Sequence, residues 1–299
     1  MAAFSASAIP SMAGQTAIVT GANSGIGRVT ARELAAKGAR VVLAVRDPEK
    51  GRQAAATMTG EVEVRQLDLA DLASVRAFAE GCTEPIDVLV NNAGIMIPPL
   101  RRTADGFESQ FGTNHLGHFA LTNRLLPRIR RRIVTVSSIG HRAGSIDFSD
   151  LNWERKAYQP MAAYGQSKLA NLLFTSELQR RLTEAGSPVL ANAAHPGLSA
   201  TNLVRPEGRP RVRQFVDAAG FSLFGQSGDQ GALPLLYAAV ADIRGNSYVG
   251  PKHLMELRGA PKLVGRSRRA RDAEVARRLW MVSEELTGVS FPADSLRSA

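Results

Sequence analysis

Short runs of β-branched residues alternate with amphipathic helical stretches along almost the whole of this chain. Strands are expected at residues 16–20, 40–45, 62–67, 86–90, 133–137, 188–194 and 246–249. Helices are expected at residues 25–37, 48–58, 71–80, 105–126, 161–185, 230–241 and 271–286. Because helices alternate with the strands, the pattern predicts a parallel sheet with helices on both faces. We therefore expect an α/β fold with a Rossmann-like, doubly wound parallel sheet of about seven strands.

The chain of 299 residues shows no internal repeat, no low-complexity linker and no break in composition. These features predict a single domain over residues 13–299, preceded by a loose tail over residues 1–12. Two stretches interrupt the alternation, at residues 139–160 and 196–229. Long insertions in a compact domain are usually functional loops, so we expect both to shape a substrate site.

The composition excludes several classes of protein. Apolar residues make up 44% of the chain and charged residues 21%, which is typical of a soluble globular protein with a sizeable core. No apolar run approaches the ~18 residues that a membrane-spanning helix needs, and the start of the chain lacks the features of a signal peptide. We therefore expect a cytoplasmic protein without stable membrane insertion. The single cysteine, Cys82, can form neither an intramolecular disulfide nor a zinc site by itself, and we expect no metal site.

The formal net charge of +10 raises the question of an anionic partner. Two arginine clusters stand out, one before a predicted strand and one near the C-terminus: Arg128, Arg130, Arg131 and Arg132, and Arg266, Arg268, Arg269 and Arg271. Neither contains interleaved aromatic residues or a groove-reading motif, so a solvated face is favoured over anionic lipid, substrate or nucleic acid. We expect no nucleic-acid partner.

A glycine-rich loop lies between the first predicted strand and the first predicted helix, with the spacing G-x-x-x-G-x-G. Glycines there allow a tight turn and a close approach of backbone N–H groups to a pyrophosphate at the helix N-terminus. Any tight turn can use glycines, but the position at the start of a βαβ unit favours a dinucleotide cofactor. The residues expected to bind it are Gly21, Asn23, Ser24, Gly25, Ile26 and Gly27.

The end of the second predicted strand distinguishes NAD from NADP. An acidic residue there would bind a ribose 2′-hydroxyl, whereas an arginine would bind a 2′-phosphate. This chain offers both, as Arg46 and Asp47. Asp47 followed by Pro48 is also a good helix start, which leaves Arg46 at the strand tip, with Arg28 nearby as a second positive charge. We therefore favour NADP as the cofactor, with NAD as the alternative.

The segment "AAYGQSKLAN" at residues 162–171 carries a tyrosine and a lysine four residues apart. Its apolar pattern predicts a helix, on which Tyr164 and Lys168 share a face. A neighbouring ammonium group favours the ionised form of a phenol, whose pKa is otherwise about 10. The spacing alone also fits an ordinary surface pair.

Several motifs occur together in one order along the chain: "TGANSGIG" at 20–27, "DL" at 68–69, "NNAG" at 91–94, "FGTNHLGHF" at 111–119, "VSS" at 136–138, "YGQSK" at 164–168 and "HPG" at 195–197. In this order the chain resembles the short-chain dehydrogenase/reductase family, over about residues 13–250. The stretch 137–182 looks like the retinol dehydrogenase and protochlorophyllide reductase branch. The chain resembles soluble bacterial members more than the membrane-anchored retinoid enzymes, because their N-terminal anchor is absent.

The resemblance implies a catalytic role for four residues. Tyr164 would donate the proton during reduction, and Lys168 would hold the nicotinamide ribose and lower the pKa of the tyrosine. Ser138 would hydrogen-bond the substrate carbonyl and stabilise the developing oxyanion. Asn114 would hold a water that links Lys168 to solvent.

The resemblance also implies cofactor contacts beyond the glycine loop. Asp68, with Leu69 beside it, would contact the adenine. The adenosine ribose would be lined by Asn92, Ala93 and Gly94. The nicotinamide would be bordered by Pro196, Gly197 and Leu198, with Thr201 bonded near its carboxamide.

Four other polar residues are alternative candidates for the site. Ser137 precedes Ser138 and would point the opposite way if the strand continues. Tyr158 has Ala162 four residues later, so no lysine activates it from the same face. We interpret His195 as structural and consider His141 a candidate pocket-lining residue.

We therefore expect an NADP(H)-dependent enzyme that interconverts a small-molecule carbonyl and the corresponding alcohol. Residues 202–227 combine apolar side chains with arginines, which indicates either a lid over the core or an apolar pocket with a basic rim. The second interpretation would suit a lipid-like or polycyclic substrate. The alternative function is a non-catalytic dinucleotide-sensing protein on the same fold. A homo-oligomer is compatible with the sequence.

Overall fold

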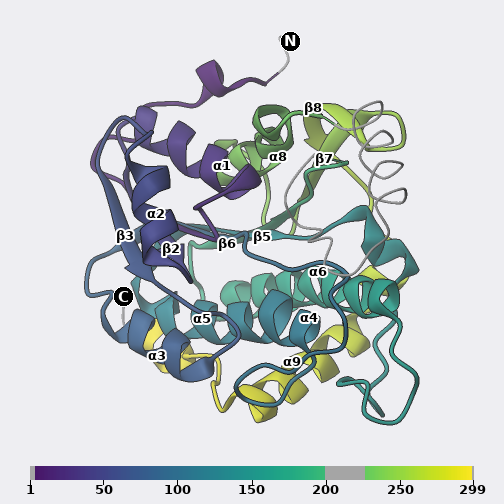
Figure 1. Cartoon of the computed structure of the whole chain (residues 1–299). Helices are drawn as coiled ribbons and strands as arrows, with labels where there is room; N and C mark the ends of the chain where they lie inside the picture. Colours follow the sequence, from purple (N-terminus) through teal and green to yellow (C-terminus); the bar gives the residue numbers. More distant parts are fainter. Residues whose placement is uncertain (1–3, 199–225, 298–299) are drawn as a thin grey trace.

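The computed structural model describes residues 4–198 and 226–297, and one sheet runs through its centre (Figure 1). The sheet has eight strands in the order β3-β2-β1-β4-β5-β6-β7-β8. The strands are β1 Thr16–Thr20, β2 Arg40–Val45, β3 Val62–Gln66, β4 Ile86–Asn91, β5 Ile129–Val136, β6 Leu190–Ala194, β7 Tyr248–His253 and β8 Arg258–Leu263. The first seven are parallel, and β8 runs antiparallel to β7. The order reverses between β1 and β4, as in a doubly wound fold.

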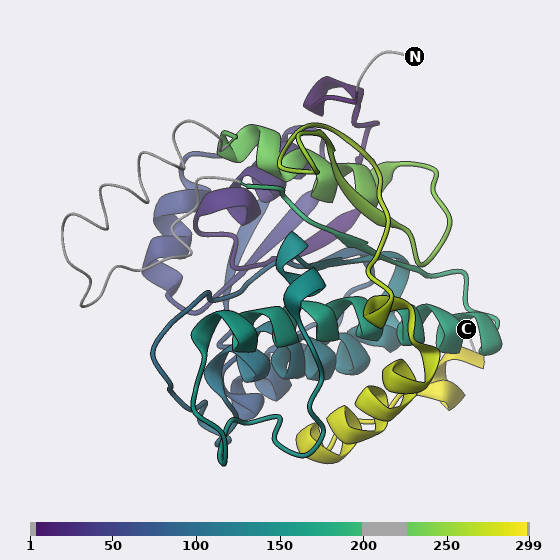
Figure 2. The same cartoon turned by 90° about the vertical axis from the view of Figure 1, so that its right-hand side faces the viewer.

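Helices cover both faces of this sheet (Figure 1). The helices are α1 Gly25–Ala36, α2 Pro48–Ala55, α3 Leu72–Glu80, α4 Ser109–Phe111, α5 Gly117–Leu125, α6 Pro160–Glu184, α8 Gly228–Val240, α9 Ala273–Thr287 and α10 Ala293–Arg297. Shorter turns are η1 Ala6–Ala8, η2 Gly112–Leu116, η3 Leu126–Arg128, η4 Ile139–Ala143 and η5 Arg269–Arg271. One layer holds α1, α2 and α8, and the other holds α3, α4, α5, α6 and α9. Figure 2 shows α9 packed outside α6.

The central strand β1 is apolar on both sides over Ala17, Ile18 and Val19, because both of its sides are buried. In β1, Ala17 and Val19 pack into the cluster under α1 and α8, whereas Ile18 packs into the cluster under α3, α5 and α6. Successive side chains of a strand point to opposite faces, so a strand covered on both faces is a continuous apolar run. Ile18 pairs in register with Val42 of β2 and Leu89 of β4, which places these side chains in the same cluster.

The α/β doubly wound architecture is confirmed, but three details of the expectation are wrong. The sheet contains β8, whose sequence "RGAPKL" lacks a β-branched run and forms an edge strand. The helix expected from residue 105 begins only at Ser109, where the Glu108 carboxylate caps it by accepting from Gln110 N and Phe111 N. Strand β5 begins at Ile129, so most of the first arginine cluster lies within the strand rather than before it.

None of the helices in the described part of the chain is long and apolar enough to cross a bilayer. Within the same residues, no group of three histidine, cysteine, aspartate or glutamate side chains is placed to hold a metal ion. Most of the second insertion, including Thr201, lies outside the described residues.

Candidate active site

The loops that follow β1, β4, β5 and β6 meet at one edge of the sheet, because the carboxyl ends of parallel strands lie together. They carry the glycine loop, the "NNAG" motif, the two serines and the "HPG" motif. Helix α6 passes this edge and contacts η4 and β5. Residues far apart in the sequence are thus brought to one place.

The glycine loop leads directly into α1. Ser24 is the N-cap residue, but its side chain makes no capping hydrogen bond, so backbone N–H groups of the first turn remain available for a ligand. Gly27 packs so closely on Asn92 that an added Cβ would lie 2.3 Å from Asn92 Nδ2. That amide nitrogen donates to Thr20 O at 2.8 Å, and the buried Asn92 Oδ1 has no partner among the described residues. A free acceptor beside uncapped N–H donors fits a dinucleotide with ribose hydroxyls and a pyrophosphate.

Thr20 connects the loops after β1 and β4, a role that sequence reasoning missed. Its Oγ1 accepts from the backbone N–H groups of Asn92 and Ala93, both at 2.9 Å. His118 Nδ1 donates to Asn114 O at 3.1 Å, so its Nε2 accepts the Thr20 hydroxyl at 2.9 Å. Burial lowers the pKa of His118 to about 4, which keeps the ring neutral. The spacing of His118 four residues after Asn114 was the available signal.

Asn114 lies in the π-helical turn η2 and is fully buried. Its Nδ2 donates to Ile95 O and Ser167 Oγ, both at 3.0 Å, and its Oδ1 accepts from Ile95 N at 2.8 Å. Lys168 Nζ donates to Val136 O at 3.2 Å. A Cβ on Gly94 would lie 3.1 Å from Asn114 Oδ1 and 3.5 Å from Lys168 Nζ, so Gly94 lies in close contact with both side chains. Gly94, Asn114 and Lys168 therefore converge.

Tyr164 and Lys168 lie on one face of α6, as predicted. Tyr164 is 6% exposed and Lys168 4% exposed, and Lys168 Nζ is 5.7 Å from the centroid of the tyrosine ring. The tyrosine ring and the Ser138 hydroxyl both lie against Gly140, where an added Cβ would lie 3.2 Å from Tyr164 Cε1 and 3.4 Å from Ser138 Oγ. Tyr164 belongs to none of the three apolar clusters of the described residues. It is therefore a buried group that faces the loop after β5.

The expected lowering of the Tyr164 pKa by Lys168 is not found in this structure. Burial raises the pKa of Tyr164, and the nearby Ser138 hydroxyl opposes this only in part. Burial also lowers the pKa of Lys168 to about 8. A desolvated lysine is easily neutralised, so its effect on the phenol depends on what else occupies the cleft.

The lowered pKa of Lys168 predicts a pH-dependent stability. The folded protein binds fewer protons than the unfolded chain between about pH 8 and 10.5, so the free energy of unfolding rises with pH in this window. The difference between the pKa values of Lys168 in the folded protein and in the unfolded chain corresponds to about 3 kcal/mol of unfolding free energy. In denaturant unfolding without cofactor, the free energy of unfolding of the wild type should rise between about pH 8 and 10.5 by up to that amount relative to Lys168→Met. A difference that stays constant from pH 7 to 10.5 would contradict the assignment.

The competing polar residues have structural partners. Strand β5 ends at Val136, and Ser137 donates to Lys168 O at 2.8 Å. Tyr158 donates to Glu108 Oε1 and accepts from Gln110 Nε2, both at 2.9 Å, and burial raises its pKa.

His141 is fully buried between two backbone groups, which is incompatible with the pocket-lining role considered for it. Its Nδ1 donates to Ser138 O at 2.6 Å, and its Nε2 accepts from Ser267 N at 3.2 Å. It holds the Ser138 segment in place.

At the tip of β2, the Arg46 side chain is exposed, whereas the Asp47 carboxylate already has hydrogen-bond partners. Asp47 caps α2 by accepting from Glu49 N and Lys50 N, and it forms an ion pair with Lys50 at 2.8 Å. The hydrogen bond and ion pair with Lys50 lower the pKa of its carboxyl. The helix-start interpretation of Asp47 is thus confirmed.

The remaining predicted cofactor residues lie around the same edge. Asp68 is half-buried after β3 and accepts from Ala70 N at 2.9 Å, whereas Leu69 is buried against α5. Pro196, Gly197 and Leu198 follow β6 and are half-buried.

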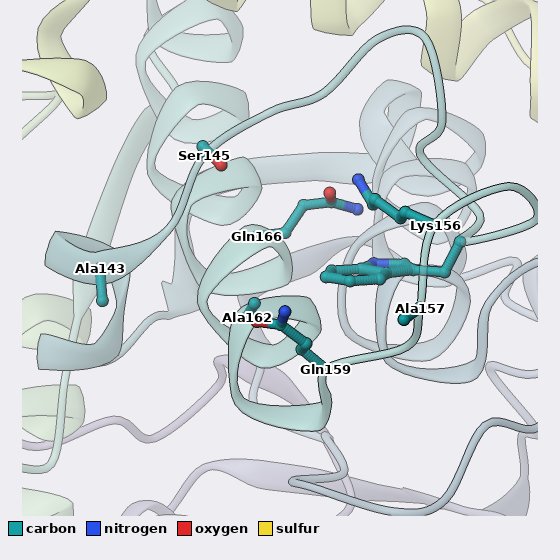
Figure 3. Close-up of a pocket in the computed structure, with 8 residues that line it drawn as sticks. Ala143, Ser145, Lys156, Ala157, Gln159, Ala162 and Gln166 are labelled. Atoms are coloured by element: carbon teal, nitrogen blue, oxygen red, sulfur yellow. The ribbon is translucent and has the colours of Figure 1, made fainter.

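A separate cavity of about 220 Å³ lies between the first insertion and α6 (Figure 3). Ala162 and Gln166 line it from α6, and Figure 3 shows the amide end of Gln166 turned toward the ammonium end of Lys156. On a helix, positions two residues from Tyr164 face nearly the opposite way. The insertion therefore forms this cavity behind the tyrosine, and its role in binding substrate stays a prediction.

Fold and site together define a dinucleotide-dependent oxidoreductase, and comparison with known proteins agrees. The family profile described as short chain dehydrogenase matches residues 15–211. Retinol dehydrogenase 13 from Homo sapiens is 46% identical, over 94% of this chain and 86% of its own length. Polyprenol dehydrogenase from Mus musculus is 43% identical, also over 94% of this chain and 86% of its own length.

Solved structures extend the comparison. An uncharacterized protein from Mycobacterium paratuberculosis has a TM-score of 0.86 and 56% identity, and the match covers 97% of this chain and 100% of the other. A second solved structure is a gluconate 5-dehydrogenase from Beutenbergia cavernae, described as NAD(P)-dependent and with bound NADP. It has a TM-score of 0.58 and 28% identity, and the match covers 77% of this chain and 91% of the other. The chain belongs to the short-chain dehydrogenase/reductase family. It is an NAD(P)-dependent oxidoreductase that acts on CH–OH groups.

Proposed function

We propose that the protein is an NADP(H)-dependent reductase or dehydrogenase that interconverts an apolar carbonyl compound and its alcohol. The observation that carries the proposal is the convergence of Ser138, Tyr164 and Lys168 at the carboxyl edge of the sheet. A buried phenol beside a serine hydroxyl and a lysine is suited to proton transfer at a substrate oxygen.

Each side chain has a definable role in this reaction. The nicotinamide supplies or accepts the hydride, which no protein side chain can do. Tyr164 gives its proton to the substrate oxygen in reduction, and Ser138 donates a hydrogen bond to the same oxygen. Lys168 would hold the ribose hydroxyls. The amide of Asn114 is occupied by Ile95 and Ser167, so its backbone carbonyl, bonded to His118, would hold the water that reprotonates Lys168.

Arg46 supports NADP as the cofactor. Its exposed guanidinium stands at the strand tip where the 2′-substituent is expected, while Asp47 is committed to capping α2. A guanidinium fits a phosphate through charge and paired N–H donors. The bound NADP in the Beutenbergia cavernae relative agrees with this choice.

We predict that NADPH binds more tightly than NADH and that Arg46→Asp narrows or reverses this preference. Loss of one charged 2′-phosphate contact should cost about 1.5–3 kcal/mol, an affinity change of about tenfold or more. Titration of each cofactor by calorimetry measures the change. Arg277→Asp is the matched control, because it makes the same charge change on an exposed position of α9. Equal affinity of the wild type for both cofactors would refute the role of Arg46.

The names of the relatives support an apolar substrate, since retinol and polyprenol are both largely hydrocarbon. The apolar segment 202–227 that suggested such a pocket lies almost entirely outside the described residues. A panel of alcohols and carbonyls, read at the absorbance band of reduced nicotinamide, tests the class. We expect retinol and long-chain alcohols to be turned over in preference to short polar ones, and the reverse order would exclude the proposed substrate.

A further inference from the structure

The tip of the β7–β8 hairpin reaches the loops that carry the active site. Three successive residues there, Leu254, Met255 and Glu256, have positive φ values of 49°, 52° and 69°. Residues other than glycine rarely adopt this backbone conformation, and it persists only where the surroundings hold it in place. In this hairpin the contacts of Glu256 and Leu257 supply that restraint.

Glu256 joins two active-site loops with one carboxylate. Its Oε2 lies 3.2 Å from His195 Nε2, and its Oε1 lies 2.9 Å from a terminal nitrogen of Arg142. The Glu256 side chain is 16% exposed, that of His195 is buried and that of Arg142 is half exposed, so solvent weakens the contact with Arg142 more than the contact with His195. His195 directly follows β6, and Arg142 lies in η4 after β5.

On the β6 side, Glu256 acts through His195. The backbone N–H of Gly197 donates to His195 Nδ1 at 3.2 Å, so the proton of the neutral ring is on Nε2 and points to Glu256. His195 is fully buried, and its Nε2 would lie 2.1 Å from a Cβ placed on Gly250. The Leu198 N–H also donates to Leu257 O at 2.9 Å. The hairpin tip thus fixes the segment proposed to border the nicotinamide.

On the β5 side, Glu256 acts through Arg142. Ser138 is the N-cap residue of the turn η4, and its hydroxyl accepts from Gly140 N at 3.1 Å. Arg142 lies four residues after Ser138 on this turn, and Tyr164 packs against the same turn at Gly140. A contact between Glu256 and Arg142 therefore connects the hairpin to the element that holds the proposed proton-transfer groups.

We propose that Glu256 is a positioning residue that sets the nicotinamide-bordering segment relative to Ser138 and Tyr164. This inference rests on the proposed function of that site. Hydride transfer requires the donor and acceptor carbons in near contact, and a small misplacement caused by a remote residue can slow such a step considerably. Glu256 touches neither reacting group, so its effect is on their alignment.

The test compares Glu256→Ala and Glu256→Gln with the wild type. Alanine removes both contacts, whereas the glutamine carbonyl can still accept the His195 N–H. In single-turnover reduction of retinal by NADPH, we expect the rate constant to fall about tenfold or more in Glu256→Ala and to stay within about threefold in Glu256→Gln. The amplitude of the single-turnover reaction reports the fraction of folded protein, separately from the rate constant. Glu184→Gln, at an exposed ion pair at the far end of α6, is the control and should match the wild type.

A second readout does not depend on turnover. The fluorescence anisotropy of bound NADPH should fall in Glu256→Ala, because the nicotinamide is held less firmly. If the alanine variant loses only amplitude or melting temperature, with rate constant and anisotropy unchanged, Glu256 is merely structural and the inference fails. A wild type that binds NADPH but reduces no substrate would overturn the proposed function, while the anisotropy would still decide the role of Glu256.

Discussion

Tyr164→Phe is expected to lower turnover by about 10²–10⁴-fold and to leave the affinity for NADPH nearly unchanged. The phenol gives up its proton only as the alkoxide forms, so its removal affects the chemical step rather than binding. The ring itself is retained and still fills the space against Gly140. Steady-state rates at saturating cofactor, with calorimetric titration of NADPH on the same sample, measure both quantities.

Tyr158→Phe is the matched control for this substitution. Its hydroxyl bonds to Glu108 and Gln110, outside the group formed by Ser138 and Lys168, so we expect a rate within a few-fold of the wild type. If Tyr158→Phe silenced the enzyme and Tyr164→Phe did not, the same-face argument for α6 would be wrong.

Lys168→Ala should damage both turnover and cofactor binding. The ammonium is placed to hold the ribose hydroxyls, and loss of a hydrogen bond to a charged group costs about 1.5–3 kcal/mol, or about tenfold or more in NADPH affinity. The phenol also loses its neighbouring positive charge, so turnover at saturating NADPH should fall by about 10²-fold or more. The two losses are measured by cofactor titration and by the rate at saturation.

Lys37→Ala provides the comparison, because Lys37 is the C-cap residue of α1 and its ammonium donates to Ser7 O in the N-terminal segment. The turnover and the NADPH affinity of Lys37→Ala should both stay near those of the wild type. If Lys168→Ala bound NADPH as tightly as the wild type, the proposed contact with the ribose would have to be abandoned.

The architecture was predictable because each element carries its own local signal. The strand β1 is apolar at Ala17, Ile18 and Val19, and Asp47 with Pro48 is a helix start that needs no distant partner. The edge strand β8 lacked such a signal, since its place depends on pairing with β7 rather than on its own residues. The late start of α4 likewise depends on Glu108, a buried carboxylate satisfied by the backbone that follows it.

The site was predictable only where residue type and spacing carry the chemistry. The spacing placed Tyr164 and Lys168 on one face, and the structure brings them to Ser138. The pKa of Tyr164 was not predictable, because burial outweighs its polar neighbours. The links made by His118 and Glu256 join residues far apart in the sequence. The spacing of His118 from Asn114 is a local signal for the first link, whereas the links of Glu256 follow from the topology alone.

The most direct test of the central claim is the rate at which retinol and NADP⁺ form reduced nicotinamide, in the wild type and in Tyr164→Phe with the same amount of cofactor bound. The account predicts steady formation by the wild type and a rate lower by about 10²–10⁴-fold in the variant. Equal rates in the two proteins would contradict the role of Tyr164. A wild type that binds the cofactor but forms no reduced nicotinamide from retinol or any other apolar alcohol would contradict the proposed reaction.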